Sequence, residues 1–341
     1  MMQGRRIWLT AGSGVMLVGL LFGEFLAPYP PQMQHRSYPL APPTPLVLVM
    51  NGPIPAIAYA PLRPDPDAKT GYRADAGGAR RLRWLTAVES GSPGGPFPLH
   101  LRLFGPSSDA PVFLLGTDEL GRDLWSRLLS SARYSIFAGV LATLLALGLG
   151  FAAGSVAGYR RGWVDAAIMR FTELLMTLPW FYLVLAASAC LPPLTGSGAT
   201  LSLLVIMLGL LGWAKPARLI RGAVLSAREQ GYVQSALGFG APEHYILRRH
   251  ILPQVRDVLL AQASSLAPQF ILAEVALTFL GVGAAPSGGS LGEMLAALQR
   301  LDAVTVGWWL WSPAFVLILV CIVFAELAES VLRTTNVREV R

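Results

Sequence analysis

The 341-residue chain is poor in the residues on which most soluble proteins and metal sites depend. Only 14% of its residues are charged, against about 25% in an average soluble domain, so a water-soluble fold is disfavoured. Cys190 and Cys321 both lie in uncharged runs, which argues against a disulfide framework or a metal set. The four histidines are His35, His100, His244 and His250. Their scatter does not match the spacing of metal ligands, and no cofactor is expected.

Lysine is nearly absent. The lysines of this chain are Lys69 and Lys215, and each follows an alanine where a phosphate-binding loop would have glycine. A phosphate-binding loop needs Gly-x4-Gly-Lys-Ser/Thr, whose backbone N–H groups cradle a nucleotide phosphate. The sequence contains no such loop, so the chain is not expected to hydrolyse ATP. Nor does it bring a nucleophile, a base or metal ligands together in or near its apolar runs. It is not expected to be an enzyme.

Long uncharged runs dominate the rest, with 53% hydrophobic residues and a mean hydropathy of +0.51. A helix crosses a bilayer with about 20 apolar residues. Spans are predicted at about 7–27, 134–158, 171–191, 200–220, 257–283 and 308–329. We therefore expect an all-α membrane protein with six transmembrane helices.

The net charge of +7 reports topology and does not indicate a nucleic-acid partner. Arg5 and Arg6 precede the first span, and seven arginines and lysines lie between the fourth and fifth spans, whereas residues 192–199 contain none. Because cytoplasmic loops carry the excess of basic residues, both termini and the loop 222–256 are predicted to be cytoplasmic.

The first 27 residues are expected to be an uncleaved transmembrane helix, because their apolar run is long and no small-x-small cleavage site follows. A cleaved leader with five remaining spans is the alternative. Residues 28–133 then form an extracytoplasmic insertion. Its strand candidates are Leu46–Met50, Arg83–Val88 and the alternating Leu99–Leu103. It is predicted to end in an interfacial helix over Gly116–Arg133, capped by Thr117 or Asp118.

Two features inside the spans are open to more than one interpretation. Gly150, Gly154 and Gly158 recur every four residues, which either lets another helix approach closely or reflects the glycine enrichment of membrane helices. Glu274 is an acid within a span. It either contacts solute or pairs with another helix.

The segment Tyr232–Pro253 is predicted to be a helix, a turn and a second helix. Gly238 and Gly240 should end the first helix, because glycine readily takes the positive φ of a C-terminal turn. Pro242 suits a first helical position. Pro253 disfavours helix at the residue before it, so the chain is expected to turn back toward the membrane there.

This pattern resembles the cytoplasmic motif of the permease subunits of binding-protein-dependent ABC importers. That motif reads Glu-Ala-Ala, three residues, Gly, nine residues and Ile-x-Leu-Pro. Here Gln234-Ser235-Ala236, Gly240 and His250-Ile251-Leu252-Pro253 keep the spacing. Gln234, Ser235 and His250 depart from the motif's residue types.

Further stretches are similar to the dipeptide/oligopeptide branch, in its C-type partner. They are Gly116–Asp123 with Ser126–Leu128, Ala157–Tyr159 with Gly162–Asp165, Ala217–Gly222, and Glu274 with Phe279–Gly283. The resemblance covers about 116–341 and the first span. It does not cover 28–115, and residues 285–292 and 324–329 depart from the branch's usual pattern.

The resemblance implies a type I ABC importer permease fold, with 134–341 as the permease core, in the bacterial inner membrane. It implies a heterodimer with a second permease, cytoplasmic ABC ATPase subunits and an extracytoplasmic solute-binding protein, and peptides as the solute. The ATPase-coupling residues would be Gln234, Ser235, Ala236, Gly240, Ala241, His250, Leu252 and Pro253. A secondary transporter or a polytopic membrane enzyme is the alternative.

Overall fold

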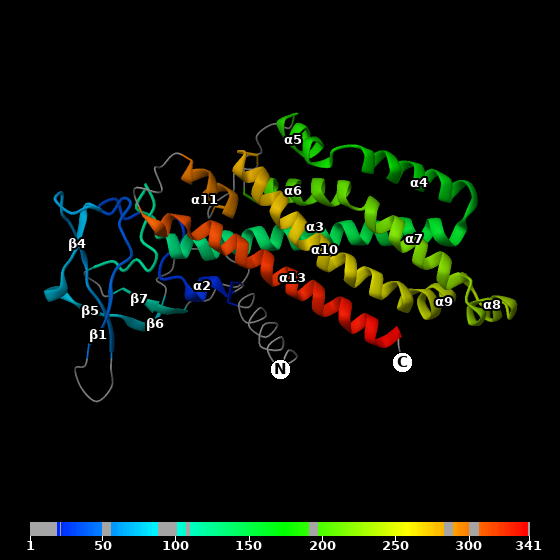
Figure 1. Ribbon diagram of the computed structural model, residues 1–341, viewed down its shortest axis with the longest axis horizontal. Coiled ribbons are helices and arrows are strands. Elements are labelled where there is room, and N and C mark those ends of the chain that lie inside the picture. The colour runs from blue at the N-terminus through cyan, green and yellow to red at the C-terminus, as the bar shows by residue number, and fades with distance from the viewer. Residues whose placement is uncertain are drawn as a thin grey trace. The chain divides into compact units, whose positions relative to one another are not determined.

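The computed structural model describes residues 19–20, 22–49, 56–87, 101–106, 110–190, 197–282, 289–299 and 307–339 (Figure 1). It divides into two compact units. The helical unit holds the described residues of 136–277 and 320–339. The mixed unit holds those of 14–135 and 278–319. Most of the predicted first span lies outside the described residues, which contain the short helix α2 (Gly23–Leu26) at its end.

Long apolar helices are the main elements. They are α3 (Leu124–Arg160), α10 (Leu252–Phe279) and α13 (Ser312–Glu339). Within the described residues, three continuous helical stretches are long and apolar enough to cross a membrane: Leu124–Arg160, Leu247–Phe279 and Trp308–Ser330. Large side chains on them face outward, such as Leu144 at 61% exposed and Phe315 at 66%. Apolar exposure of this extent suits lipid or a partner chain.

The predicted third and fourth spans fall on bent helix pairs. One pair is α4 (Gly162–Thr177) with α5 (Trp180–Cys190), and the other is α6 (Ser197–Gly212) with α7 (Ala214–Arg228). The bends are 79° and 44°. Pro179 explains the first break, because a proline disfavours helix at the residue before it. The described residues therefore contain three spans, or up to five if each bent pair is one span.

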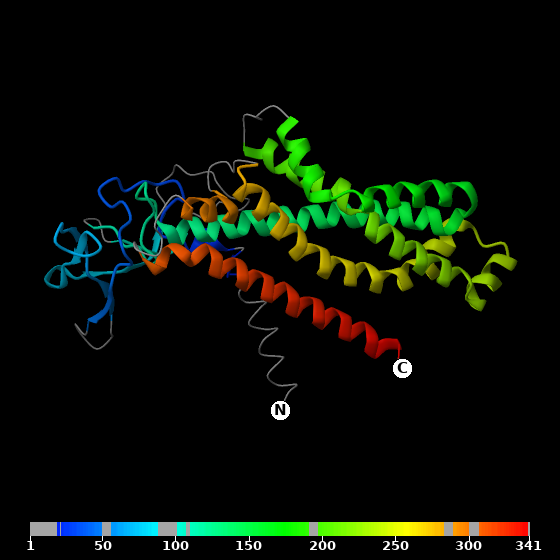
Figure 2. The same ribbon diagram turned by 45° about the horizontal axis from the view of Figure 1, so that its top comes forward.

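Helix α4 lies beside α7 in both ribbon views (Figures 1 and 2). An ion pair joins them, since the Arg221 guanidinium donates to both carboxylate oxygens of Asp165 at 2.5 and 2.6 Å. Such a two-point contact fixes orientation as well as distance.

Helix α3 packs against α7 through its glycines. A Cβ added to Gly154 would lie 2.4 Å from the carbonyl oxygen of Ala217, and one added to Gly158 would lie 2.9 Å from Val224. A Cβ on Gly150 would meet Pro216 at 2.8 Å. The spacing of four residues therefore serves close helix approach, as the first of its two interpretations predicts.

The predicted helix over Gly116–Arg133 begins later than expected, since only its residues from Leu124 on are helical. Residues 116–123 form a turn, in which Gly116 and Gly121 have φ of +74° and +71°. Thr117 cannot cap a helix, because its hydroxyl donates to the Tyr38 carbonyl and accepts from the Ala41 N–H. Helix α3 instead begins at Leu124, and the Asp123 carboxylate accepts from the Ser126 N–H at 2.8 Å. From there α3 runs unbroken through the predicted second span.

Acidic and basic side chains are buried together at this turn. Arg127, whose side chain is 5% exposed, donates to Asp118 at 2.6 Å and lies 3.6 Å from Glu293. Asp118 also accepts from the Arg122 guanidinium at 2.7 Å. Asp123 is 2% exposed, and burial raises the pKa of its carboxyl to about 7.

Seven short strands lie among the described residues of the mixed unit. They are β1 (Leu46–Val49), β2 (Ala56–Tyr59), β3 (Leu62–Pro64), β4 (Tyr72–Ala74), β5 (Arg80–Arg81), β6 (Arg83–Ala87) and β7 (Leu101–Gly105), with the 3₁₀ turn η1 (Ala76–Gly78). All pairs are antiparallel, in the orders β1-β2-β5, β3-β4 and β6-β7. Strands β1, β6 and β7 fall on the three predicted strand segments, in which Met50, Val88, Leu99 and His100 lie outside the described residues. A small core of Tyr29, Ala41, Leu62 and Phe113 includes the first residue of β3, and Tyr72 and Ala74 of β4 pack against it.

The mixed unit also contains α11 (Leu291–Leu298) and the 3₁₀ turn η3 (Trp308–Trp311). The Ser290 hydroxyl accepts from the Glu293 N–H at 3.3 Å and caps α11. Serine followed three residues later by glutamate is a capping signature, and this signal was present in the sequence.

Candidate coupling site

The loop between α7 and α10 contains three short helical pieces. They are α8 (Gly231–Gly238), α9 (Glu243–Ile246) and the π-helical turn η2 (Leu247–Ile251). The predicted helix, turn and helix are therefore present. Gly240 alone makes the turn, with φ of +78°, and the Ala241 N–H donates back to the Ala236 carbonyl at 3.1 Å. Gly238 remains inside α8.

Pro253 does not interrupt the helix, which corrects the expectation that it disfavours helix at Leu252. Helix runs on from α9 through η2 into α10. A proline inside an α-helix loses a hydrogen bond and its ring clashes with the carbonyl four residues earlier. The π turn changes that register, since the Leu252 N–H donates to the Leu247 carbonyl five residues back. Pro253 then lies in the first turn of α10, where a missing N–H is tolerated.

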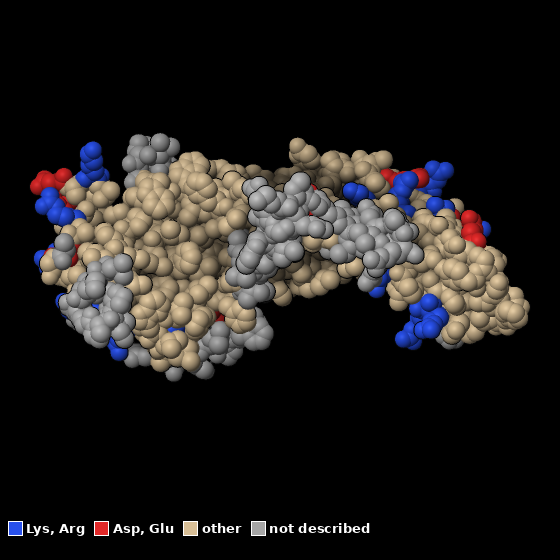
Figure 3. All heavy atoms as spheres, turned by 60° about the horizontal axis from the view of Figure 1, so that its bottom comes forward, with Lys and Arg blue, Asp and Glu red and all other residues tan. Residues whose placement is uncertain are grey.

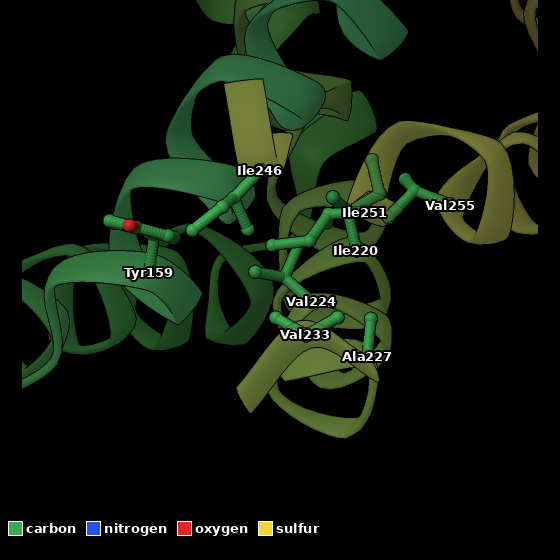
Figure 4. Close-up of a cluster of buried hydrophobic side chains, with 8 residues drawn as sticks. All are labelled: Tyr159, Ile220, Val224, Ala227, Val233, Ile246, Ile251 and Val255. Carbon is green, nitrogen blue, oxygen red and sulfur yellow. The ribbon is translucent and has the colours of Figure 1, made fainter. Parts of the chain in front are cut away.

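A buried apolar cluster holds the loop to the helical unit (Figure 4). Its eight members are Tyr159, Ile220, Val224, Ala227, Val233, Ile246, Ile251 and Val255. They come from α3, α7, α8, α9, η2 and α10, so every piece of the loop contributes to one core. All except Tyr159 are at most 1% exposed. The loop is thus a packed extension of the helices and has a defined surface.

Arg228 reinforces this attachment at the end of α7. Its guanidinium donates to the carbonyl oxygen of Tyr159 and lies 5.0 Å from the centre of the Tyr159 ring. A cation over an aromatic face is attractive because the ring face carries negative charge density. The end of α7 is therefore tied to the end of α3.

The predicted coupling residues differ in their exposure. Gln234, Ser235, Gly240, Leu252 and Pro253 are exposed, and Ala236, Ala241 and His250 are half-buried. Two of the polar side chains bond within the loop. The Gln234 amide donates to the Arg228 carbonyl, and the Ser235 hydroxyl donates to the Gly231 carbonyl, both at 2.9 Å.

The structure adds Phe239, which pattern reasoning did not single out. Its side chain is 91% exposed, between α8 and the Gly240 turn. A phenylalanine so exposed next to a packed core is typical of a surface that a partner covers. Arg248 and Arg249 are also exposed on η2, so the surface combines one apolar anchor with positive charge.

The two remaining expectations concern Glu274 and metal. Glu274 lies in α10 and is completely buried, as a paired or pore-facing acid in a span would be. Its role stays a prediction. Within the described residues, no group of three His, Cys, Asp or Glu side chains could hold a metal ion.

Charge is unevenly distributed over the surface. On the face drawn in Figure 3, charged side chains gather in separate groups. Residues 150–334, which include α4 to α10 and the whole loop, match the family of the binding-protein-dependent transport system inner membrane component. The chain belongs to this family. It is a multi-pass membrane permease.

Similar proteins of known family place the chain in the dipeptide and oligopeptide branch of these permeases. The dipeptide transport system permease protein DppC of Bacillus subtilis (strain 168) is 35% identical over 226 residues, which is 66% of this chain and 67% of that protein. The oligopeptide transport system permease protein OppC of Mycobacterium tuberculosis (strain ATCC 25618 / H37Rv) is 33% identical over 208 residues, 61% of this chain and 70% of that protein. A solved amino acid ABC transporter chain aligns with a TM-score of 0.46 and 15% identity, over 61% of this chain and 94% of that one.

Family membership shows which subunit of a transporter this chain is. It is a pore-forming subunit of a binding-protein-dependent ABC importer, and ATP hydrolysis belongs to a separate subunit. The secondary transporter and the membrane enzyme are not favoured. This permease must therefore receive its energy through a surface contact.

Proposed function

We propose that this permease pairs with a second permease chain to form a peptide pore in the bacterial inner membrane. In this arrangement it has six transmembrane helices, and both termini and the loop 222–256 are cytoplasmic. The strand-containing insertion lies on the extracytoplasmic side, where a solute-binding protein delivers solute. The placement of basic residues supports this topology.

ATPase subunits dock on the loop 222–256, and the observation that carries this proposal is the exposure of Phe239. The backbone beneath Phe239 is held by the buried cluster, so the side chain is presented on a firm support. The surrounding surface residues keep the spacing of the coupling motif. Those residues are Gln234, Ser235, Ala236, Gly240, Ala241, His250, Leu252 and Pro253. Truncating an aromatic anchor at the centre of an interface costs about 2 kcal/mol or more.

Phe239→Asp is expected to reduce ATPase binding at least about tenfold, because it removes an apolar anchor and places a carboxylate at the interface. The fold should survive, since the side chain contributes almost nothing to the core. Co-purification of the tagged permease complex, with the ATPase-to-permease ratio as readout, measures the effect.

Trp163→Asp is the matched control, because Trp163 is an aromatic that is 81% exposed on α4, outside the loop. We expect this variant to retain the ATPase. If Phe239→Asp bound ATPase as well as the unaltered chain, the docking proposal would fail. Equal losses in both variants would show that the loop holds no specific anchor.

Peptides are the proposed solute, on the basis of the names of the relatives. The sequence departs from the branch's usual pattern at 285–292 and 324–329, so the motifs there do not support one particular solute. Glu274 is proposed as either a solute contact or a partner for another helix. The test is a calorimetric titration of the cognate binding protein with a mixture of di- to hexapeptides. We expect saturable binding. Binding of a metal chelate in place of every peptide would contradict the proposal.

A further inference from the structure

A group of polar and aromatic side chains lies beside the buried cluster of the coupling loop. Tyr232 on α8 and Tyr245 on α9 both contact His250 on η2. The ring centres of Tyr232 and His250 are 5.6 Å apart, and those of Tyr245 and His250 are 5.7 Å apart. Gln254, in the first turn of α10, donates its amide N–H to the Tyr232 hydroxyl. We name Tyr232, Tyr245, His250 and Gln254 the aromatic clasp.

Each clasp residue directly precedes a member of the buried cluster. The four pairs are Tyr232 with Val233, Tyr245 with Ile246, His250 with Ile251, and Gln254 with Val255. Neighbouring residues on a helix point about 100° apart, so one side of each element enters the core while the adjacent side enters the clasp. The cluster members of these pairs are labelled in Figure 4. The clasp therefore forms the outer rim of the core.

The clasp and the core share α8, α9, η2 and α10, but only the core reaches α7. The core joins the whole loop to α7 through Ile220, Val224 and Ala227. The clasp instead joins α8 and α9 to η2 and α10 without any residue of α7. His250 lies inside the π turn, which is a wider and less regular winding than an α-helix. A push on α8 thus has a direct side-chain route into the start of α10.

We propose that Tyr232 and Tyr245 are positioning residues that make α8 and the start of α10 move together when an ATPase closes. The proposal rests on the docking function above and deepens it, by assigning the route along which the movement leaves the docking surface. It also accounts for His250 at a position where the coupling motif has isoleucine, because the imidazole ring fills the space between two tyrosine rings.

The first test is the Tyr232→Ala variant of the complete transporter in proteoliposomes. The binding protein, preincubated with a mixture of di- to hexapeptides, is added, and the ratio of stimulated to unstimulated ATP hydrolysis is measured. We expect this ratio to fall at least about fivefold, since the coupling free energy between the two sites is lost. Tyr232→Phe keeps the ring and should retain at least half of the stimulation. A double variant with Tyr245→Ala should lose less than the two single losses together, because both tyrosines act on one imidazole.

The second test needs no solute. Hydrogen exchange of the assembled complex should show about tenfold faster exchange across 247–256 in Tyr232→Ala, and unchanged exchange in α7, because local opening increases where the contacts are lost. Unchanged exchange across 247–256 would overturn the proposal. So would a Tyr232→Ala variant with full stimulation. The peptide proposal fails by a different result, namely if peptides do not stimulate ATP hydrolysis by the unaltered transporter. The docking proposal fails by a third result, namely if the Phe239→Asp variant still binds the ATPase.

Discussion

Gly154→Leu is expected to separate α3 from α7 and to leave little folded permease. A Cβ at this position would lie 2.4 Å from the Ala217 carbonyl oxygen and 3.1 Å from the Cβ of Ile220. The first of these is a backbone atom in the first turn of α7, so it cannot move without displacing that helix. Overpacking of a tight interface costs about 1–3 kcal/mol and occasionally more, and a backbone clash belongs at the upper end.

Gly148→Leu is the matched control, because Gly148 lies on the same helix and no atom lies within 4 Å of its added Cβ. Leucine also favours helix over glycine by about 0.5–1 kcal/mol, so this variant should be as stable as the unaltered chain or slightly more so. The measurement is thermal unfolding in detergent together with the yield of monodisperse protein. Equal stability of the two variants would contradict the close packing of α3 and α7.

Arg127→Ala is expected to be the second severe substitution. It removes the more deeply buried of the two arginines that pair with a buried carboxylate and leaves Arg122 as the remaining partner. The expected loss is therefore about 3 kcal/mol, the lower end of the range for breaking a buried pair. Asp118 has a side chain only 12% exposed, and Arg127 is 2.6 Å from it. Glu293, in the first turn of α11, would lose its nearby positive charge as well. Thermal unfolding in detergent should therefore show a large decrease in the midpoint temperature.

Arg170→Ala separates this burial effect from the loss of an arginine in general. Arg170 pairs with Glu173 at 3.1 Å, but its side chain is 84% exposed. Water already solvates both charges there, so the expected loss is about 0.5 kcal/mol or less. Similar losses in Arg127→Ala and Arg170→Ala would argue against a buried network at the start of α3.

The helices that local pattern predicted well are those whose apolar residues decide their position without help from neighbours. Helices α10 and α13 cover the fifth and sixth predicted spans, because an uncharged run of that length is stable only where lipid or protein covers it. Strand β7 was predictable from the alternating run at Leu99–Leu103, since short alternating runs between turn residues favour strands.

Boundaries were less predictable because long-range contacts determine them. Thr117 looks like a helix cap in the sequence, but its hydroxyl bonds to Tyr38 and Ala41, about 80 positions earlier. Pro253 looks like a helix end, but the π turn before it absorbs the missing hydrogen bond. At Thr117 a tertiary contact outweighed the local preference, and at Pro253 a change in helix winding did so.

The coupling site shows the same division. Spacing alone placed Gln234, Gly240 and Pro253 in one functional segment, since the motif is local in sequence. It did not identify Phe239 as an anchor, because exposure depends on what the rest of the chain leaves uncovered. Nor did it bring Tyr232 to His250, which are 18 positions apart and meet only when α8 folds back on η2.

By itself, the sequence determined that this protein lies in a membrane, that it has no phosphate-binding loop, and which segment resembles a coupling motif. These properties follow from composition and from residues close together along the chain. The tertiary structure alone decided where α3 begins, how closely its glycines approach α7, and which side chains of the loop are presented to a partner. Those properties depend on atoms brought together from distant parts of the chain, and no local pattern records them.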